Sequence, residues 1–133
     1  MKYISLQDAL NIHDIIIQKM QGLGGYNQTN LGYLDSALEN IQNDDFYPNF
    51  DDKLTHLMFS CIKFHPFNDG NKRTSIYLAM HFLTINDREH LTYNFAQKME
   101  DIVVCVAEDS IDKNELKNIL TNMLQSKNKP RKP

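Results

Sequence analysis

The residues most able to carry out chemistry lie together in residues 65–74, which read His-Pro-Phe-Asn-Asp-Gly-Asn-Lys-Arg-Thr. Pro66 ends the preceding helical pattern and disfavours helical geometry at His65, and a new apolar helical pattern begins near Asn71. The segment is therefore predicted to be a loop that leads into a helix. Because the first turn of a helix has unpaired N–H groups and the positive end of the helix dipole, this loop is predicted to bind an anion.

The side chains of this segment suit phosphate chemistry. Gly70 lets the backbone approach a phosphate closely, and Lys72 and Arg73 add two positive charges, the guanidinium being able to bind two oxygens at once. Asp69 is a lone carboxylate beside this anion site, which is a usual arrangement for Mg²⁺ on a nucleotide. His65 is the candidate general base for a hydroxyl, since an imidazole changes its protonation near neutral pH.

Each of these residues also has a simpler explanation. A lone histidine after a helix is more often a capping or surface residue, a carboxylate followed by glycine is a turn signal, and two adjacent cations can be a solvated helix face. All of these explanations would have to hold together within one short segment. Phe67 is moreover expected to turn inward and to hold the loop and His65 in place. We therefore prefer a site for phosphoryl or nucleotidyl transfer.

The rest of the chain predicts an all-α domain. The chain has 133 residues, of which 41% are hydrophobic and 23% charged, as expected for one domain with a single core. The helix after the loop is apolar on most sides and is predicted to lie at the centre of a compact helical bundle. Apolar residues recur at helical spacing over about residues 5–20, 31–42, 51–64, 71–85, 95–107 and 112–125.

The ends of these helices and the segments between them are also predictable. Ser5 is expected to cap the first helix, and Asp51 or Asp52 the third. Residues 45–50, interrupted by a proline, are expected to form a loop or a short β-hairpin flap. Residues 89–93 are expected to be extended. The domain is predicted to span residues 1–126, and the basic residues 127–133 are expected to form a flexible tail.

Composition excludes several classes of function. The net charge of −3 does not favour direct binding of nucleic acid. No apolar run has the length of a membrane span, and the N-terminus does not resemble a signal peptide. Cys61 and Cys105 fall in apolar stretches and are expected to be buried thiols in a reducing, cytoplasmic protein. The chain has no P-loop, and no third ligand is spaced to complete a zinc site with His65 and Asp69.

The remaining histidines carry weaker signals. His13 lies on the apolar face of the first predicted helix and is expected to be a buried core histidine with a hydrogen-bond partner. His56 is expected to be a surface residue on a face shared with Lys53 and Ser60. His81 and His90 suggest no specific role.

Residues 65–73 resemble the signature of the Fic/Doc family, which reads His-x-Phe-x-Asp/Glu-Gly/Ala-Asn-Gly/Lys-Arg. The resemblance extends along nearly the whole chain to the short Doc (death-on-curing) branch of the family. Its further marks are His13-Asp14, the glycines of residues 22–25 and the sequence Gly-Tyr-Leu-Asp-Ser-Ala-Leu at residues 32–38. This resemblance implies the Fic fold, with ATP and Mg²⁺ as cofactors.

The resemblance also implies a role for the residues of the signature. His65 would deprotonate the target hydroxyl, and Asp69 would hold Mg²⁺ on the nucleotide. Gly70 and Asn71 would form the anion hole, and Arg73 would clamp phosphates. With the loop-anchoring Phe67 and the variable lysine, the residues implied in nucleotide binding are Phe67, Gly70, Asn71, Lys72 and Arg73.

Two positions bear on the type of reaction. Fic enzymes that transfer AMP usually have glycine where this chain has Lys72, whereas Doc-like proteins have lysine and resemble kinases that pass on the terminal phosphate. Many AMP-transferring relatives also have a second arginine where this chain has Ile76. Both differences favour the Doc-like branch.

The Doc resemblance implies a toxin of a toxin–antitoxin system that acts on translation elongation factor Tu and arrests growth. No Ser or Thr has a glutamate four positions later, so the inhibitory glutamate helix of many Fic proteins is not expected in this chain. Inhibition would then come from an antitoxin protein with a disordered segment that folds on binding. Two alternatives stay open: an AMP-transferring Fic enzyme, and a non-enzymatic binding module with the Fic fold, against which the intact His65, Asp69 and Arg73 count.

Overall fold

The computed structural model describes residues 1–125. The predicted basic tail at residues 127–133 lies outside the described residues. Six α-helices and one short 3-10 helix form the described part of the chain: α1 (Leu6–Met20), α2 (Gln28–Asn40), α3 (Phe50–Phe64), α4 (Asn71–Ile85), η1 (Glu89–Thr92), α5 (Phe95–Ala107) and α6 (Lys113–Gln125). Residues 1–125 contain no strand, so the predicted all-α class is confirmed. Among these helices none combines the length and the apolar character that a membrane span requires.

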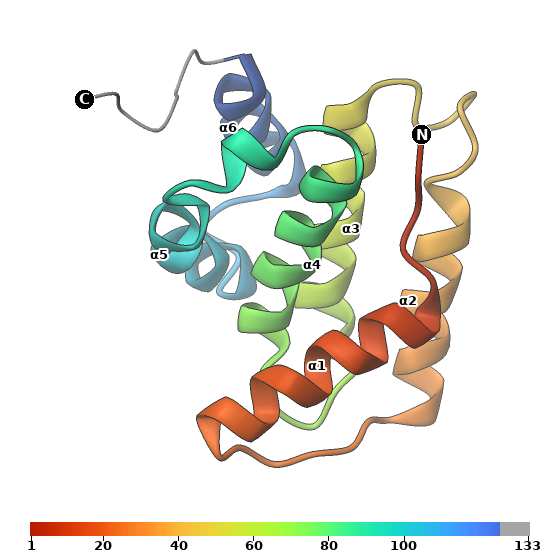
Figure 1. The fold of residues 1–133 in the computed structure, drawn as a ribbon, viewed down its shortest axis with the longest axis vertical. Coiled ribbons are helices and arrows are strands. Elements are labelled where there is room, and N and C mark those ends of the chain that lie inside the picture. The colour runs from red at the N-terminus through yellow and green to blue at the C-terminus, as the bar shows by residue number, and fades with distance from the viewer. Residues whose placement is uncertain (126–133) are drawn as a thin grey trace.

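Helices α3 and α4 lie side by side in the middle of the molecule (Figure 1), and α4 also packs against α1, α5 and η1. The predicted central position of α4 is confirmed, because most of its residues are buried. They are Asn71, Thr74, Ser75, Ile76, Leu78, Ala79, Phe82 and Leu83. Removing the apolar side chains of this set from water is the main stabilising contribution of the helix.

Helix α1 begins and ends as the sequence predicts. The hydroxyl of Ser5 accepts a hydrogen bond from the backbone N–H of Asp8 at 3.0 Å, and the Asp8 carboxylate accepts one from the backbone N–H of Ser5 at 3.2 Å. This reciprocal pair satisfies two N–H groups that the helix start leaves unpaired. Gln21 ends the helix in the left-handed conformation. In Figure 1, α1 crosses the end of the bundle where α4 begins.

Two local predictions are wrong. Helix α3 is capped by Asn49 instead of Asp51 or Asp52, and Asp52 accepts a hydrogen bond from the backbone N–H of Asn49 at 3.0 Å. Residues 89–92 form η1 where an extended segment was expected. Of the two alternatives predicted for residues 45–50, the loop is confirmed: residues 45–49 form turns and bends without a hairpin, and Phe50 begins α3. Local propensity did not separate these alternatives, because each segment is short and its conformation depends on the packing around it.

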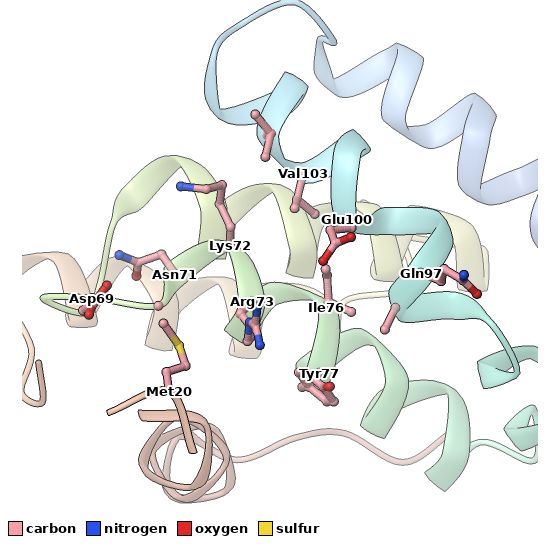
Figure 2. Close-up of a pocket in the computed structure, with 13 residues that line it drawn as sticks. Met20, Asp69, Asn71, Lys72, Arg73, Ile76, Tyr77, Gln97, Glu100 and Val103 are labelled. Atoms are coloured by element: carbon pink, nitrogen blue, oxygen red, sulfur yellow. The ribbon is translucent and has the colours of Figure 1, made fainter. Parts of the chain in front are cut away.

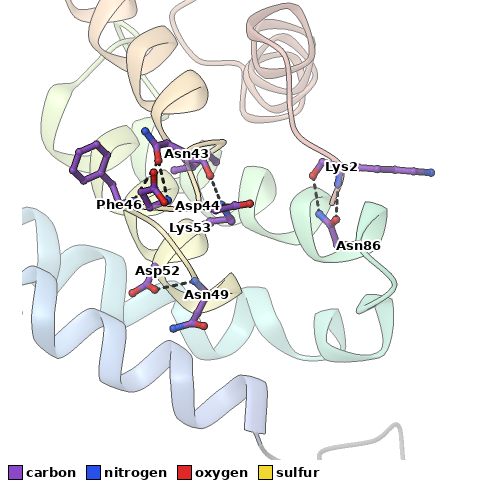
Figure 3. A network of polar contacts seen from close by, with 10 residues as sticks. Lys2, Asn43, Asp44, Phe46, Asn49, Asp52, Lys53 and Asn86 are labelled. Atoms are coloured by element: carbon purple, nitrogen blue, oxygen red, sulfur yellow. Dashed lines mark hydrogen bonds and ion pairs between the residues drawn. The ribbon is translucent and has the colours of Figure 1, made fainter.

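The polar face predicted on α3 is instead largely buried. Lys53 is only 1% exposed, with its ammonium group bound to the backbone oxygen of Ile41 and, at 2.8 Å, to the carboxylate of Asp44 (Figure 3). Ser60 is also 1% exposed. His56 is half-buried and its Nδ1 lies 2.8 Å from Nζ of Lys113 in α6, so its assignment to the surface is wrong. Lys113 of α6 contacts His56, whereas the segment after α2 contacts Lys53, and the sequence of α3 alone reveals neither contact.

The N-terminal segment is held against the end of α4. The backbone N–H of Lys2 donates to Oδ1 of Asn86 at 2.8 Å, and Nδ2 of Asn86 donates to the backbone oxygen of Lys2 at 2.9 Å (Figure 3). Both cysteines are free thiols: Cys61 is buried as predicted, whereas Cys105 is only partly buried.

Candidate active site

His65 ends α3 in the left-handed conformation, with φ 50° and ψ 57°, and Pro66 follows it. This geometry confirms the predicted break and turns the histidine out of the helix, so that its side chain is exposed. Its backbone oxygen accepts a hydrogen bond from Nδ2 of Asn30 in α2 at 3.3 Å. Its ring Nδ1 lies 2.9 Å from Nδ2 of Asn71, the first residue of α4.

The loop after His65 is fastened to the segment between α1 and α2. The backbone N–H of Asn27 donates to Pro66 O at 3.0 Å, and the backbone N–H of Asn68 donates to Gly25 O at 3.0 Å. These bonds flank an isolated antiparallel bridge between Tyr26 and Phe67. The loop is therefore held by a strand-like contact that sequence periodicity did not predict, because it spans too few residues to show an alternating pattern.

Phe67 turns inward as predicted and is 3% exposed. Its ring stacks on the imidazole of His13 with a centroid distance of 3.8 Å and an interplanar angle of 9°. His13 Nε2 also lies 2.8 Å from the backbone oxygen of Asp69. The prediction of a buried core histidine is confirmed, and its partner proves to be the candidate site loop.

Gly70 forms the N-cap of α4 with φ 79°, a conformation that L side chains rarely adopt. A Cβ atom there would also lie 3.2 Å from Cδ1 of Ile17 in α1. No side chain of residues 1–125 caps this helix. The first-turn N–H groups of α4 therefore remain available for an anion, as the sequence predicts.

Asp69 lies against the turn that follows α1. Its Oδ2 accepts a hydrogen bond from the backbone N–H of Leu23 at 3.0 Å. A Cβ atom at Gly22 would approach that oxygen to 2.6 Å, so the absence of a side chain there lets the carboxylate fit. Gly22 thus makes room for the carboxylate, and Gly25 makes room for the side chain of Asn68 in the loop.

A cavity of about 520 Å³ opens beside the first two turns of α4. On the α4 side it is lined by the loop and by the exposed residues Lys72 and Arg73 (Figure 2). None of the ion pairs within residues 1–125 involves either cation. Of the residues singled out in the sequence, Asp69, Gly70, Asn71, Lys72 and Arg73 line the cavity, whereas His65 and Phe67 do not. His65 contacts Asn71 in the cavity wall through its ring Nδ1.

The opposite wall of the cavity was not predicted. It comes from α5 and includes Gln97, Glu100, Val103 and Val104. Figure 2 shows Glu100 beside Ile76 of α4. The sequence of α5 contains no motif, and only its packing against α4 brings these residues to the cavity.

Cys61 lies beneath the start of α4 and plays a packing role. Its thiol donates a hydrogen bond to the backbone oxygen of Asn71 at 3.5 Å. Burial raises the pKa of this thiol to about 12, which keeps it protonated and unreactive at neutral pH.

The loop and the start of α4 described above lie within a stretch of the chain that matches a known protein family. A family model described as the Fic/DOC family matches residues 3–83. This chain belongs to the Fic/DOC family. No curated protein matches it significantly.

Membership of the Fic/DOC family assigns the coarse function. Proteins of the family generally transfer nucleotide or phosphate groups to other proteins, typically with ATP and Mg²⁺. The matched residues of this Fic/DOC protein run from the start of the chain through most of α4 and contain the whole site loop. Helices α5 and α6, and with them the second wall of the cavity, lie beyond the matched residues.

Proposed function

We propose that this protein is a Doc-like protein kinase that transfers the terminal phosphate of ATP to a hydroxyl of a target protein. The observation that carries the proposal is the hydrogen-bonded unit of His65, Asn71 and the first turn of α4 beside the 520 Å³ cavity. This unit connects a candidate base to an anion site. Phosphoryl transfer depends mostly on positioning and on charge stabilisation, which such a unit can supply.

The residues of the loop would bind the nucleotide by its phosphates. Free N–H groups of the α4 first turn would donate to phosphate oxygens, and the guanidinium of Arg73 would bind two oxygens at once. The cavity volume of about 520 Å³ suits a ligand of nucleotide size. His65 would accept the proton of the attacking hydroxyl.

Asp69 fits Mg²⁺ by its donor type. Protein-bound Mg²⁺ usually has one or two carboxylate ligands, with phosphates and water completing the shell, so one carboxylate beside an anion site is sufficient. One oxygen of Asp69 accepts the hydrogen bond from Leu23, and this bond would hold the carboxylate in place. When bound, the ion would neutralise charge on the phosphates.

Lys72 and Ile76 favour transfer of the terminal phosphate over transfer of AMP. Lys72 is exposed at the mouth of the proposed anion site and adds a long cationic side chain where AMP-transferring relatives usually have glycine. Such a side chain would obstruct in-line attack at the α-phosphorus and favour a pose that presents the γ-phosphate to His65. Ile76 lines the cavity at the position of the second arginine of those relatives.

Intact mass spectrometry of the modified target tests the type of reaction. Phosphate transfer predicts a mass gain of about 80 Da, with ADP as the other product. A gain of about 329 Da, with pyrophosphate released, would refute the kinase and show AMP transfer instead. A cell lysate incubated with ATP labelled at either the α- or the γ-phosphate identifies the target, and the protein with His65 replaced by asparagine is the control.

The biological role belongs to the same proposal. The Doc resemblance makes translation elongation factor Tu the first target to test, and its modification would arrest growth. The enzyme would act in the cytoplasm, where ATP is available. An antitoxin protein would inhibit the enzyme in trans. Induced expression should stop growth, and the His65→Asn variant should not; equal growth with both would contradict the toxin role.

A further inference from the structure

The side chain of Asn71 is fully engaged inside the protein. It is 6% exposed, although it lies at the wall of the cavity. Its Oδ1 accepts a hydrogen bond from the backbone N–H of Phe67 at 2.9 Å, and its Nδ2 donates to the backbone oxygen of Phe67 at 2.8 Å. Its Nδ2 also lies 2.9 Å from Nδ1 of His65.

The two contacts with Phe67 fix which end of the amide is oxygen and which is nitrogen. A backbone N–H only donates and a backbone carbonyl only accepts. Turning the Asn71 amide by half a rotation would place its NH₂ against the N–H of Phe67 and its oxygen against the carbonyl. Two favourable contacts would then become two repulsive ones, so the orientation follows from the backbone itself.

This orientation determines the proton position on His65. The Nδ2 of Asn71 only donates, so the His65 Nδ1 it faces must be the acceptor. A neutral imidazole has one donor and one acceptor nitrogen, and the proton is therefore on Nε2. We propose that Asn71 is a positioning residue that holds neutral His65 in the Nε2–H tautomer and makes Nδ1 the proton-accepting atom.

The consequence for catalysis, though not the tautomer itself, rests on the proposed function. The target hydroxyl would displace the Asn71 amide from Nδ1 of His65. Its O–H bond breaks and the proton moves to Nδ1, while its oxygen forms a bond to the γ-phosphorus. The bond from the γ-phosphorus to the bridging oxygen breaks, and its electron pair leaves with ADP. The proton on Nδ1 then passes to solvent.

The same contacts revise the part that Asn71 would play in the anion hole. Its amide hydrogens are directed at Phe67 and His65, so phosphate would meet its backbone N–H in the first turn of α4. Loss of the side chain should therefore disturb the base more than it disturbs nucleotide binding.

Nitrogen-15 NMR of the full-length protein tests the tautomer without any nucleotide. At alkaline pH, where an imidazole is neutral, long-range proton–nitrogen spectra report which ring nitrogen of His65 carries hydrogen. The His65→Asn spectrum assigns its signals. We expect Nδ1 without a proton and a scalar coupling across the hydrogen bond between Asn71 Nδ2 and His65 Nδ1. A protonated Nδ1, or no such coupling, would overturn the assignment.

Two replacements of Asn71 extend the test. In Asn71→Asp the carboxylate accepts from Nδ1, so that nitrogen should become protonated. In Asn71→Ala the amide donor is lost, so both neutral tautomers of His65 should be populated in the nitrogen-15 spectra, and a spectrum unchanged from wild type would overturn the positioning role. Wild-type protein that binds no ATP would refute the proposed function, and the NMR spectra would still decide the role of Asn71.

Discussion

The Nε2 of His13 lies 2.8 Å from the backbone oxygen of Asp69, although the two residues are 56 positions apart in the sequence. A carbonyl oxygen only accepts, so Nε2 carries the proton and donates it to this bond. The same ring, 2% exposed, stacks on Phe67. One buried histidine of α1 therefore supports the loop at both its anchoring aromatic residue and its candidate metal-binding residue.

Replacing His13 by alanine should destabilise the protein and weaken ATP binding together. The variant loses the stacking contact and leaves the backbone oxygen of Asp69 without its partner, which should lower the free energy of unfolding by about 2–4 kcal/mol. Urea unfolding and calorimetry with ATP measure the two effects. His90→Ala, at an exposed histidine of η1, is the matched control. If His13→Ala and His90→Ala unfolded at the same urea concentration, the contacts of His13 would contribute nothing to the stability of the fold.

Replacing His65 should abolish transfer without unfolding the protein. Loss of a general base typically costs on the order of 10²–10⁴ in rate. Asparagine is the better replacement because it tolerates the positive φ of 50° at this position, whereas alanine adds backbone strain. The rate of target modification and the thermal midpoint are measured side by side. Transfer near the wild-type rate would exclude His65 as the base.

Asp69 and Arg73 should affect ATP binding in different ways. Asp69→Asn should weaken binding with Mg²⁺ present and have little effect in EDTA, since the carboxylate acts through the ion. Arg73→Ala should weaken binding in both conditions, because its guanidinium contacts phosphate directly. Calorimetry gives both comparisons. Lys98→Ala, an exposed cation of α5 outside the cavity lining, is the control for net charge. Equal losses for Asp69→Asn with and without EDTA would contradict its metal role.

His56 should make the stability of the protein depend on pH below neutrality. Burial, together with the positive charge of Lys113, lowers its pKa from 6.5 to about 4. Between these values the unfolded chain binds the proton and the folded protein does not, so the free energy of unfolding should fall as the pH decreases from about 6.5 to about 4. With solvent screening we expect a loss of about 2 kcal/mol.

Urea unfolding at several pH values measures this dependence. Between pH 4 and 6.5 the free energy of unfolding should change less with pH in His56→Gln than in wild type. The carboxylates are the same in both proteins, so their contribution cancels when the two are compared. Identical slopes would show that His56 titrates alike in the folded and unfolded chains.

Most of the fold could be predicted because its signals are local. Helices α4 and α5 begin and end at the predicted residues, since apolar periodicity and breaking residues act within a few turns. The misassigned segment at residues 89–92 is a single turn, too short for periodicity to identify. The misplaced His56 has a different cause: its burial comes from α6, which lies far along the chain.

The sequence by itself determined the chemical content of the site. His65, Asp69, Gly70 and Arg73 lie within one loop and one helix start, so their spacing alone predicts an anion site beside a histidine and a carboxylate. Only the tertiary structure decided how these groups are held. The donor from His13, the turn at Gly22 that accommodates Asp69, and the α5 wall with Glu100 come from distant segments. Their positions depend on how the helices pack. Because these residues lie far apart along the chain, no local sequence pattern predicts that they meet.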